Sequence, residues 1–263
     1  MPRRPSSSSS ASRREAPFPY LGEEVDFPFP APETADEQGI VCAGGNLSPG
    51  LLLSAYRRGI FPWFSENEPI LWWSPDPRFV LFPEELHVSG TKIKRLRIRG
   101  FDLALDRVFP AVIRACSSSP RPGQDGTWIT QGMVEAYIEL HRLGYAHSVE
   151  ARRGDELVGG LYGVALGSMF FGESMFSRVD DASKAAFIPF VWRLREEGFT
   201  LVDSQVYTDH LAGLGAREIP RSEYLRLLAD RLAATTRKGD WAKVLEGFPD
   251  SKSYRSLVLR EKS

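Results

Sequence analysis

The side chains of Asp203 and Gln205 have the types and the spacing for hydrogen-bonding a ligand and for acid-base chemistry. Asp203 lies at the predicted end of the strand FTLVD, and Gln205 follows two residues later. Open sheets bind ligands outside the carboxyl ends of their strands, and the two-residue period of a strand points both side chains to one face. The alternative is structural, because Asp203 could instead cap the turn or helix in TDHLAGLG.

Glu173 is a second candidate, because it stands in the strongly apolar segment MFFGESMF. A carboxylate on such a strand is costly to remove from water unless it is paired. We therefore expect a buried arginine or a substrate ammonium beside it, and a purely structural ion pair would satisfy the same requirement. The histidines occur in no HxxxH or HxH pattern, so we expect no metal, no catalytic triad and no cofactor.

The segment 59–78, GIFPWFSENEPILWWSPDPR, is dense in aromatic residues and proline. Proline fixes backbone angles and removes amide donors. We therefore expect Trp63, Trp72 and Trp73 on a stiff, mostly extended scaffold rather than on a helix or a regular strand. A rigid aromatic surface can stack nucleobases, although the same rings could simply close a small core.

A local basic segment follows in a chain whose charges otherwise balance. The formal net charge is -1 and the sequence pI is about 6.5, so binding to nucleic acid requires a local patch. The segment TKIKRLRIRG alternates cationic with apolar residues, which predicts a strand with its cations on one face. These cations are Lys92, Lys94, Arg95, Arg97 and Arg99. A basic amphipathic stretch is usually a solvated edge; contact with a nucleic-acid backbone is the alternative, which the place of the segment beside the aromatic residues favours.

These candidates need a sheet and helices to position them. Caps and apolar periodicity predict helices over residues 49–58, 106–117, 130–143, 180–198 and 221–234, the first of them capped by Ser48. Strands are predicted in FVLFP, HSVEAR, ELVGGLYGVAL, SMFFGES and FTLVDSQV. Antiparallel strands that lead into one strand-helix-strand crossover resemble the mixed sheet of the GNAT acyltransferase fold. We therefore expect an α+β protein with a GNAT-like C-terminal domain.

The predicted domain organisation is a disordered leader over 1–26, a small N-terminal domain over 27–77, the GNAT-like domain over 78–236 and a tail over 237–263. A chain of 263 residues with 42% hydrophobic content can bury a substantial core. No apolar run approaches the ~18 residues of a membrane span. Cys42 and Cys116 form no CxxC pattern, which favours a reducing compartment, and we expect a cytoplasmic protein.

A GNAT-like sheet ordinarily binds coenzyme A through a glycine-rich loop at a helix N-terminus. Here the segment SRVDDASK places Asp180 and Asp181 at that helix start. They can cap the helix, but they would repel a pyrophosphate. The sequence therefore favours acyl transfer from a donor other than coenzyme A.

Read together, several collinear segments over residues 27–235 resemble the leucyl/phenylalanyl-tRNA protein transferase family. They are AGGNLSPGLLLSAYRRGIFPWF, PILWWSPDPR, GTWIT, YAHSVE, LVGGLYGV, FFGESMFSRVDDASK and LVDSQV. The resemblance implies transfer of leucine or phenylalanine from Leu-tRNA or Phe-tRNA to proteins that begin with arginine or lysine, which marks those proteins for degradation. It implies neither a cofactor nor a metal, and no membrane.

The resemblance also implies roles for individual residues. Trp63 and Trp128 would bracket the terminal adenosine of the donor. The aminoacyl pocket would consist of Leu161, Phe170, Glu173, Phe190, Leu194 and Val202, with Glu173 near its polar end. Methionine is familiar at the position of Leu161, and the less flexible leucine is expected to alter the preference among leucine, phenylalanine and methionine as donor residues. The basic segment would hold the tRNA backbone.

Asp203 and Gln205 match the proposed catalytic pair of the family. Gln205 would hold the acceptor amine while Asp203 polarises that contact or relays the proton; alternatively, the enzyme would act mainly by orientation. The cationic acceptor needs an acidic partner, for which Glu173, Asp125 and Asp181 are candidates. Two other functions remain open: a coenzyme A-dependent N-acyltransferase, and a non-catalytic RNA-binding module in which Asp203 and Gln205 are structural.

Overall fold

The computed structural model describes residues 18–119 and 128–245, which form two sheets flanked by helices. The larger sheet has seven strands in the order β10 (Arg217–Ile219), β4 (Arg78–Leu81), β9 (Leu201–Gln205), β8 (Met169–Ser177), β7 (Glu156–Leu166), β6 (Ala146–Arg153) and β5 (Asp102–Leu105). The smaller sheet has the order β1 (Ile40–Ala43), β3 (Leu71–Trp73) and β2 (Phe61–Pro62). Only β8 and β9 pair in parallel among the described strands, so the predicted mixed α+β class is confirmed.

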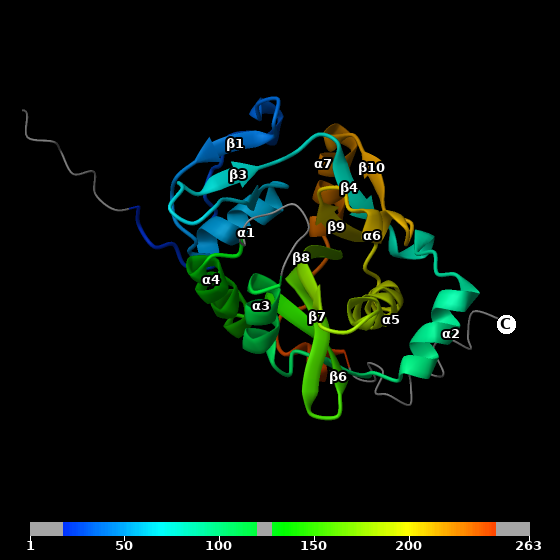
Figure 1. Cartoon of the computed structure of the whole chain (residues 1–263). Helices are drawn as coiled ribbons and strands as arrows, with labels where there is room; N and C mark the ends of the chain where they lie inside the picture. The colour runs from blue at the N-terminus through cyan, green and yellow to red at the C-terminus, as the bar shows by residue number, and fades with distance from the viewer. Residues whose placement is uncertain (1–17, 120–127, 246–263) are drawn as a thin grey trace, which may run out of the picture.

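The helices cover both faces of the larger sheet (Figure 1). One group consists of α1 (Pro49–Arg57), α3 (Phe109–Ser117), α4 (Gln131–Arg142) and α7 (Arg221–Leu232). The other consists of α2 (Gly90–Arg99), α5 (Ala182–Glu196), α6 (Asp209–Ala212) and α8 (Trp241–Val244). Short 3-10 turns occur at η1 (Pro32–Thr34) and η2 (Pro83–Glu85). No helix in the described ranges is long and apolar enough to span a bilayer.

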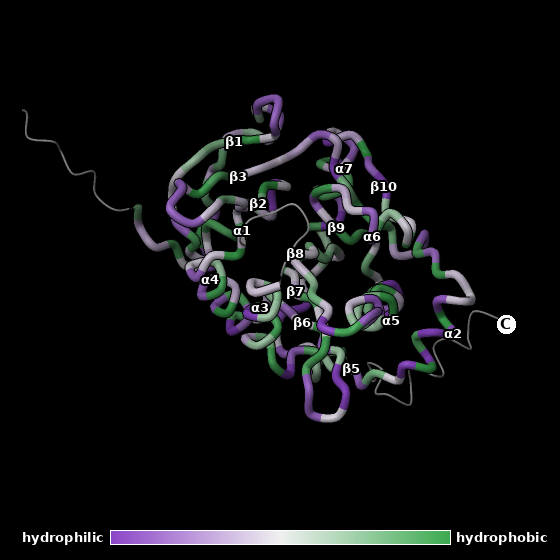
Figure 2. The backbone as a smooth tube through the Cα atoms, viewed as in Figure 1, coloured by the Kyte–Doolittle hydropathy of each residue, from purple (hydrophilic) through white to green (hydrophobic). Residues whose placement is uncertain are grey.

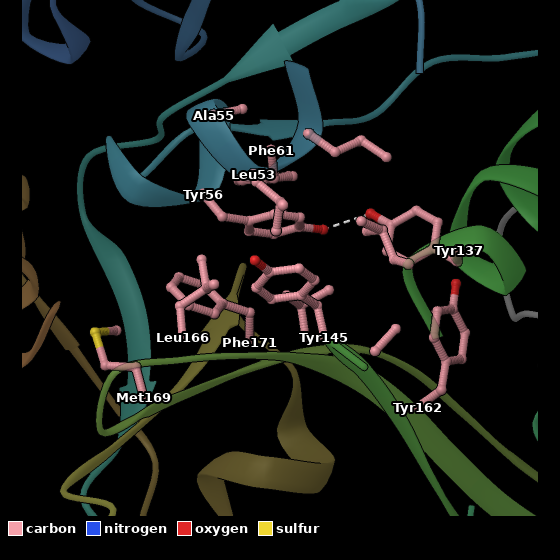
Figure 3. Packing of buried hydrophobic residues seen from close by; sticks show 14 of the residues in the cluster. Leu53, Ala55, Tyr56, Phe61, Tyr137, Tyr145, Tyr162, Leu166, Met169 and Phe171 are labelled. Carbon is pink, nitrogen blue, oxygen red and sulfur yellow. Dashed lines mark hydrogen bonds between the residues drawn. The ribbon is translucent and has the colours of Figure 1, made fainter. Parts of the chain in front are cut away.

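The core consists of two clusters on opposite faces of the sheet, because a strand with a period of two buries alternate residues on each side. The first cluster joins α1, α3, α4 and α7 to the sheet. In it, Tyr56 of α1 packs against Phe171 and Tyr137 of α4 packs against Tyr162 (Figure 3). The second joins α5 to residues such as Leu161, Phe170 and Val202. The first cluster also includes Phe61 of β2, so residues before and after position 78 share one core.

Most predicted elements are confirmed. The meander β6–β7–β8 and the crossover through α5 to the parallel strand β9 occur where the sequence predicts them. The side chain of Thr130 accepts the backbone N–H of Met133 and caps α4. The capping role predicted for Ser48 is wrong, since its side chain makes no capping hydrogen bond at the start of α1.

The basic segment is the helix α2, and the predicted strand is wrong. The hydroxyl of Ser89 accepts the backbone N–H of Lys92 at 3.3 Å, and Gly100 ends the helix with φ of 60°. A three-residue and a four-residue step place Lys92, Arg95 and Arg99 on one side of a helix. The five cations therefore do not share one face. The helix protrudes from the body and is largely hydrophilic (Figures 1 and 2).

The aromatic segment forms regular strands, which corrects the expectation of an extended scaffold outside regular strands. Trp72 and Trp73 lie on β3, which pairs with β1 and β2. Trp72 is buried, so the alternative of core packing holds for this ring. Trp63 follows β2 and is half-buried. Its carbonyl accepts the indole N–H of Trp73 at 2.6 Å, and the two rings lie 5.4 Å apart.

Both ends of the described chain contact the body. Of the predicted leader, residues 1–17 lie outside the described residues, whereas Asp26 forms an ion pair with Arg58 at 2.7 Å. Of the tail, residues 246–263 lie outside the description. Trp241 is fully buried, and its ring stacks on His147 at 3.8 Å. Its backbone N–H donates to Asp106 at 2.9 Å, so this part of the tail docks on the body.

Candidate active site

The parallel strands β8 and β9 separate where the predicted catalytic residues lie. Their pairing consists of Met169 with Leu201, Phe170 with Val202 and Phe171 with Asp203. Beyond these pairs β8 continues to Ser177 and β9 continues to Gln205 without further backbone pairing between the two strands. A gap between neighbouring strands leaves room for side chains and for a ligand at the centre of the sheet.

β-Bulges in the pairing of β8 with β7 and of β9 with β4 redirect side chains toward this gap. In the pairing of β7 with β8, Glu173 is an extra residue without a partner, and in the pairing of β4 with β9 the extra residue is Ser204. Such bulges bend a strand and redirect its side chains. Gln205 has φ of 65°, a left-handed conformation that is uncommon for glutamine.

The carboxylate of Glu173 is the centre of a buried hydrogen-bond network. Its Oε1 accepts the hydroxyl of Tyr56 at 2.7 Å and the amide Nε2 of Gln205 at 2.8 Å, and its Oε2 accepts the hydroxyl of Tyr137 at 2.9 Å. The two tyrosine hydroxyls, from α1 and α4, also bond to each other (Figure 3). Burial raises the pKa of Glu173 to about 7, although the three hydrogen bonds favour its charged form.

Among the described residues no arginine bonds to Glu173, which leaves the alternative of a substrate ammonium open, and a buried arginine pairs with Asp203 instead. Arg78 Nε donates to Asp203 Oδ1 at 2.9 Å, and Arg78 Nη2 donates to Oδ2 at 2.7 Å. Oδ2 also accepts the hydroxyl of Tyr224 at 2.7 Å, and Oδ1 accepts the backbone N–H of Gln205 at 2.9 Å. Asp203 therefore holds the backbone of Gln205. It does not cap α6, whose capping residue is Thr208.

A cavity of about 750 Å³ occupies the gap between the strands. Trp63 and Trp128 both line it, as do Glu173 and Gln205. Its apolar lining includes Leu161, Phe170, Val202, Phe187, Met175 and Phe61. The two tryptophans, the apolar side chains and the hydrogen-bonded pair Glu173–Gln205 thus line one cavity, which is the arrangement expected of a ligand site.

The structure brings most of the predicted site residues together and leaves others outside the lining. Phe190 and Leu194 are buried but do not line the cavity; the ring of Phe190 packs edge-on against Phe170 at 4.9 Å. Asp203 is likewise outside the lining. Phe187 lies one helical turn before Phe190 and reaches the cavity, so the apolar periodicity of α5 could have identified it.

Tyr56 and Tyr137 were not expected at the site. Each tyrosine lies within an amphipathic helix, and nothing in its local sequence distinguishes it from a core residue. Glu173 lies 117 residues from Tyr56 and 36 residues from Tyr137 along the chain. Only the tertiary fold brings these groups into contact.

The predicted cations differ in their partners. Arg95 bonds to Asp181 at 2.6 Å, and Arg99 bonds to Asp181 at 3.2 Å and to Asp180 at 3.3 Å. Asp181 makes no capping hydrogen bond to α5, so its predicted capping role is wrong. Over the described part of the chain, Lys94 and Arg97 are exposed and make no ion pair with a carboxylate.

His210 adds a neutral imidazole to the lining of the cavity. Burial lowers the pKa of His210 to about 4, and the nearby charges of Lys184 and Lys92 act in the same direction. Asp125, a candidate partner for the acceptor, lies outside the described residues. Within residues 18–119 and 128–245, no cluster of histidine, cysteine and carboxylate side chains is arranged to hold a metal ion.

Comparison with known proteins gives the family. Its sequence model, described as leucyl/phenylalanyl-tRNA protein transferase, matches residues 80–229, and the model of its N-terminal domain matches residues 45–76. A leucyl/phenylalanyl-tRNA--protein transferase of Myxococcus xanthus is 53% identical over 228 residues, covering 86% of this chain and 97% of the relative. One from Pseudomonas fluorescens is 58% identical over 206 residues, covering 78% and 91%.

Among solved structures, a conserved protein of unknown function from Staphylococcus epidermidis aligns with a TM-score of 0.38 and 12% identity, covering 55% of this chain and 57% of that chain. This likeness is too low to support an argument. The sequence relatives, in contrast, are similar over nearly their whole length. The chain therefore belongs to the leucyl/phenylalanyl-tRNA protein transferase family and is an aminoacyltransferase.

Proposed function

We propose that this aminoacyltransferase moves leucine or phenylalanine from aminoacyl-tRNA to the N-terminal arginine or lysine of acceptor proteins. The observation that carries the proposal is the single cavity that joins Trp63 and Trp128 to an apolar wall through Glu173 and Gln205. An aminoacyl-tRNA ester has matching parts: a base at one end, an apolar side chain at the other end and the reacting carbonyl between them. The new N-terminal residue would then mark the acceptor for degradation.

Trp63 and Trp128 would stack the terminal adenine of the donor. Base stacking on an aromatic ring contributes about 1 to 3 kcal/mol per base. The indole N–H of Trp73 bonds to the carbonyl of Trp63, and this contact supports a fixed orientation of the Trp63 segment. The arrangement accounts for an aromatic residue that is half-buried at a cavity rather than enclosed in the core.

The aminoacyl side chain would occupy the wall formed by Leu161, Phe170 and Val202, to which the structure adds Phe187. Phe190 and Leu194 would act from behind this wall, by supporting Phe170. A methylene in an apolar pocket discriminates by only about 1 to 3 kcal/mol, so methionine is expected as a side substrate. Leu161 is less flexible than methionine and would influence the preference among the three donors.

Gln205 would hold the acceptor amine at the reacting ester. Because Asp203 is bonded to Arg78, Tyr224 and the backbone of Gln205, its contacts support a positioning role rather than direct contact with substrate. An aminoacyl ester is intrinsically activated, and positioning of reactants alone can lower a barrier by about 7 kcal/mol. The pair Asp203 and Gln205 would thus act chiefly by orientation.

The tRNA backbone would lie along α2, where Lys94 and Arg97 are exposed and Lys92 is half-buried. Arg95 and Arg99 would contribute less directly, because their bonds to Asp180 and Asp181 attach α2 to the start of α5. Phosphate contacts of this kind release counterions and make binding dependent on salt.

We also propose that the larger sheet is a GNAT-like variant and that the chain divides near residue 78 into an N-terminal domain over 27–77 and a catalytic domain over 78–236. The meander β6–β7–β8 followed by the crossover to β9 supports the first proposal. Because the donor would be a charged tRNA, the reaction is assigned to the cytoplasm. Acceptors with a cationic end need an acid, and Glu173 is the carboxylate that lines the cavity among the described residues.

The experiment is an extension assay with labelled Leu-tRNA or Phe-tRNA and matched peptides that begin with arginine, lysine, aspartate or alanine. Extension of the arginine and lysine peptides alone is the expected result. Extension of the aspartate peptide would overturn the acceptor assignment. Donor binding without any extension would favour a non-catalytic RNA-binding module. Acylation of the peptides by acetyl-coenzyme A would favour a coenzyme A-dependent N-acyltransferase.

A further inference from the structure

We propose that Glu173 carries the proton in the transfer reaction, taking it from the attacking amine and giving it to the leaving ribose oxygen. The inference rests on the proposed function, since it assigns the acid-base group of that reaction. It reassigns this task from Asp203, and it makes Tyr56 and Tyr137 positioning residues that act through Glu173.

Glu173 meets the geometric requirement for such a group, because it lines the cavity and reaches the same amide that would hold the amine. Gln205 Nε2 lies 2.8 Å from Glu173 Oε1. An amine hydrogen-bonded to the side-chain oxygen of Gln205 would stand next to this carboxylate. A proton-transfer group must lie within hydrogen-bond reach of the atom it serves, or one water away.

Asp203 does not meet this requirement. Its two oxygens accept hydrogen bonds from two N–H groups of Arg78, from the hydroxyl of Tyr224 and from the backbone N–H of Gln205. Its side chain is 0% exposed and takes no part in the lining of the cavity. A carboxylate has about four lone-pair positions, and four donors already occupy those of Asp203, so it offers no free position to a proton of the substrate.

The bonding partners of Glu173 leave its charge without a neutralising cation. Within the described ranges its side-chain partners are the two tyrosine hydroxyls and one amide. Asp203 adds a like charge from β9 and thereby raises the pKa of Glu173 beyond the effect of burial. Arg78, on β4, is bonded to Asp203 rather than to Glu173. Burial raises the pKa of Tyr56 and of Tyr137 well above 10, so both remain neutral donors.

A carboxyl group that titrates close to cellular pH can both accept and return a proton. In the step, the neutral amine nitrogen attacks the ester carbon and forms the new C–N bond, after which the bond from carbon to the ribose oxygen breaks. The nitrogen then carries one surplus proton, which passes to Glu173. The same proton passes from Glu173 to the ribose oxygen, so that an amide and a hydroxyl are formed and the carboxylate is restored.

The test is the pH profile of single-turnover transfer from Phe-tRNA to an arginine-initiated peptide. The hydroxyls of Tyr56 and Tyr137 favour the carboxylate form of Glu173, so their removal raises its pKa. In Tyr56→Phe and in Tyr137→Phe, the limb of the profile that is set by protonation of Glu173 is expected to move to higher pH by about one unit. The limb set by the acceptor amine, whose pKa is ~7.7 to 8.0, stays in place.

Glu173→Gln is expected to abolish the limb that is set by protonation of Glu173 and to lower the transfer rate by about 10²-fold or more. The matched control is Tyr145→Phe, which removes a tyrosine hydroxyl from the same core cluster outside the cavity and is expected to keep the wild-type profile. Thermal unfolding and donor binding of every variant separate a change in chemistry from a loss of structure.

An unmoved limb in both tyrosine variants, or an unchanged rate in Glu173→Gln, would overturn the inference while wild-type transfer still supports the proposed function. An absence of transfer by the wild-type chain, with donor binding intact, would overturn both. If one tyrosine variant does not fold, the other variant and Glu173→Gln still decide the result.

Discussion

Arg78, the first residue of β4, forms a buried bidentate ion pair with Asp203 on the neighbouring strand β9. The two contacts are 2.9 Å and 2.7 Å long, and the side chains are 1% and 0% exposed. The guanidinium also lies 4.5 Å from the ring centre of Tyr224 and 4.8 Å from that of Phe61. The pair thus joins a residue at the end of the aromatic segment to the strand that carries Gln205.

We predict that Arg78→Met destabilises the protein by about 3 to 5 kcal/mol, because it leaves the charge of Asp203 buried without a partner. The double variant Arg78→Met/Asp203→Leu is expected to recover a large part of this loss. Urea unfolding measures both free energies. The exposed pair Arg217–Glu85 is the matched control, and Glu85→Gln there is expected to cost about 0 to 1 kcal/mol. Equal losses at the two pairs would contradict the assignment.

The roles of Asp203 and Gln205 separate in single-turnover kinetics. Gln205→Asn suits the left-handed backbone at this position but shortens the side chain by one methylene. It is expected to lower the transfer rate by about tenfold or more with little change in the free energy of unfolding. Asp203→Asn is expected to lower stability and rate together, since it weakens the pair with Arg78. A wild-type rate in Gln205→Asn would dismiss its positioning role.

Donor binding is predicted to depend on the exposed cations of α2. Replacement of both Lys94 and Arg97 by alanine is expected to weaken tRNA binding and to reduce the slope of log K against log salt by about 1.4 to 1.8. The slope is measured by filter binding of Leu-tRNA over a range of salt. Arg226, an exposed cation of α7, is the matched control. Equal salt slopes for the wild type and the double variant would place the tRNA elsewhere.

Trp241 is predicted to stabilise the protein and to influence the choice of donor. Its ring lies 6.2 Å from Phe170, which lines the cavity, and 6.1 Å from Phe190 behind it. Trp241→Ala is expected to cost about 3 to 5 kcal/mol. The milder change Trp241→Phe is expected to let Phe170 move back and to alter the ratio of phenylalanine to leucine transfer by up to about tenfold.

The control for Trp241→Phe is Trp72→Phe, which reduces an equally buried ring in the other core cluster. It is expected to lower the melting temperature without altering the donor ratio. The ratio comes from competition between Leu-tRNA and Phe-tRNA in one reaction. The same donor ratio in Trp241→Phe and in the wild type would confine Trp241 to a structural role.

The meander and crossover could be predicted because their signals are local. Apolar periods, the turn at Gly154 and the helix end at Gly198 each lie within the element that they define, and both glycines adopt positive φ. The error over α2 arose because alternate cations fit a strand as well as a helix. The caps of this helix were present in the sequence: Ser89 bonds to the amide of Lys92, and Gly100 adopts φ of 60°.

The site could be predicted only in part. Glu173 was identified because a carboxylate in an apolar strand is costly, but its partners are tyrosines from α1 and α4 rather than an arginine. The arginine at Arg78 lies 125 residues from Asp203 along the chain. Long-range partners of this kind depend on the register of neighbouring strands, and no local periodicity specifies that register.

A crystal structure of the chain with an adenosine that carries phenylalanine through a stable amide at its 3′ position would locate the donor directly. We expect adenine stacked on Trp63 and Trp128, the phenyl ring against Phe170 and Leu161, and the amide carbonyl beside Gln205. An analogue bound outside the gap between β8 and β9, or in the gap with its ends reversed, would rule out this cavity as the donor site.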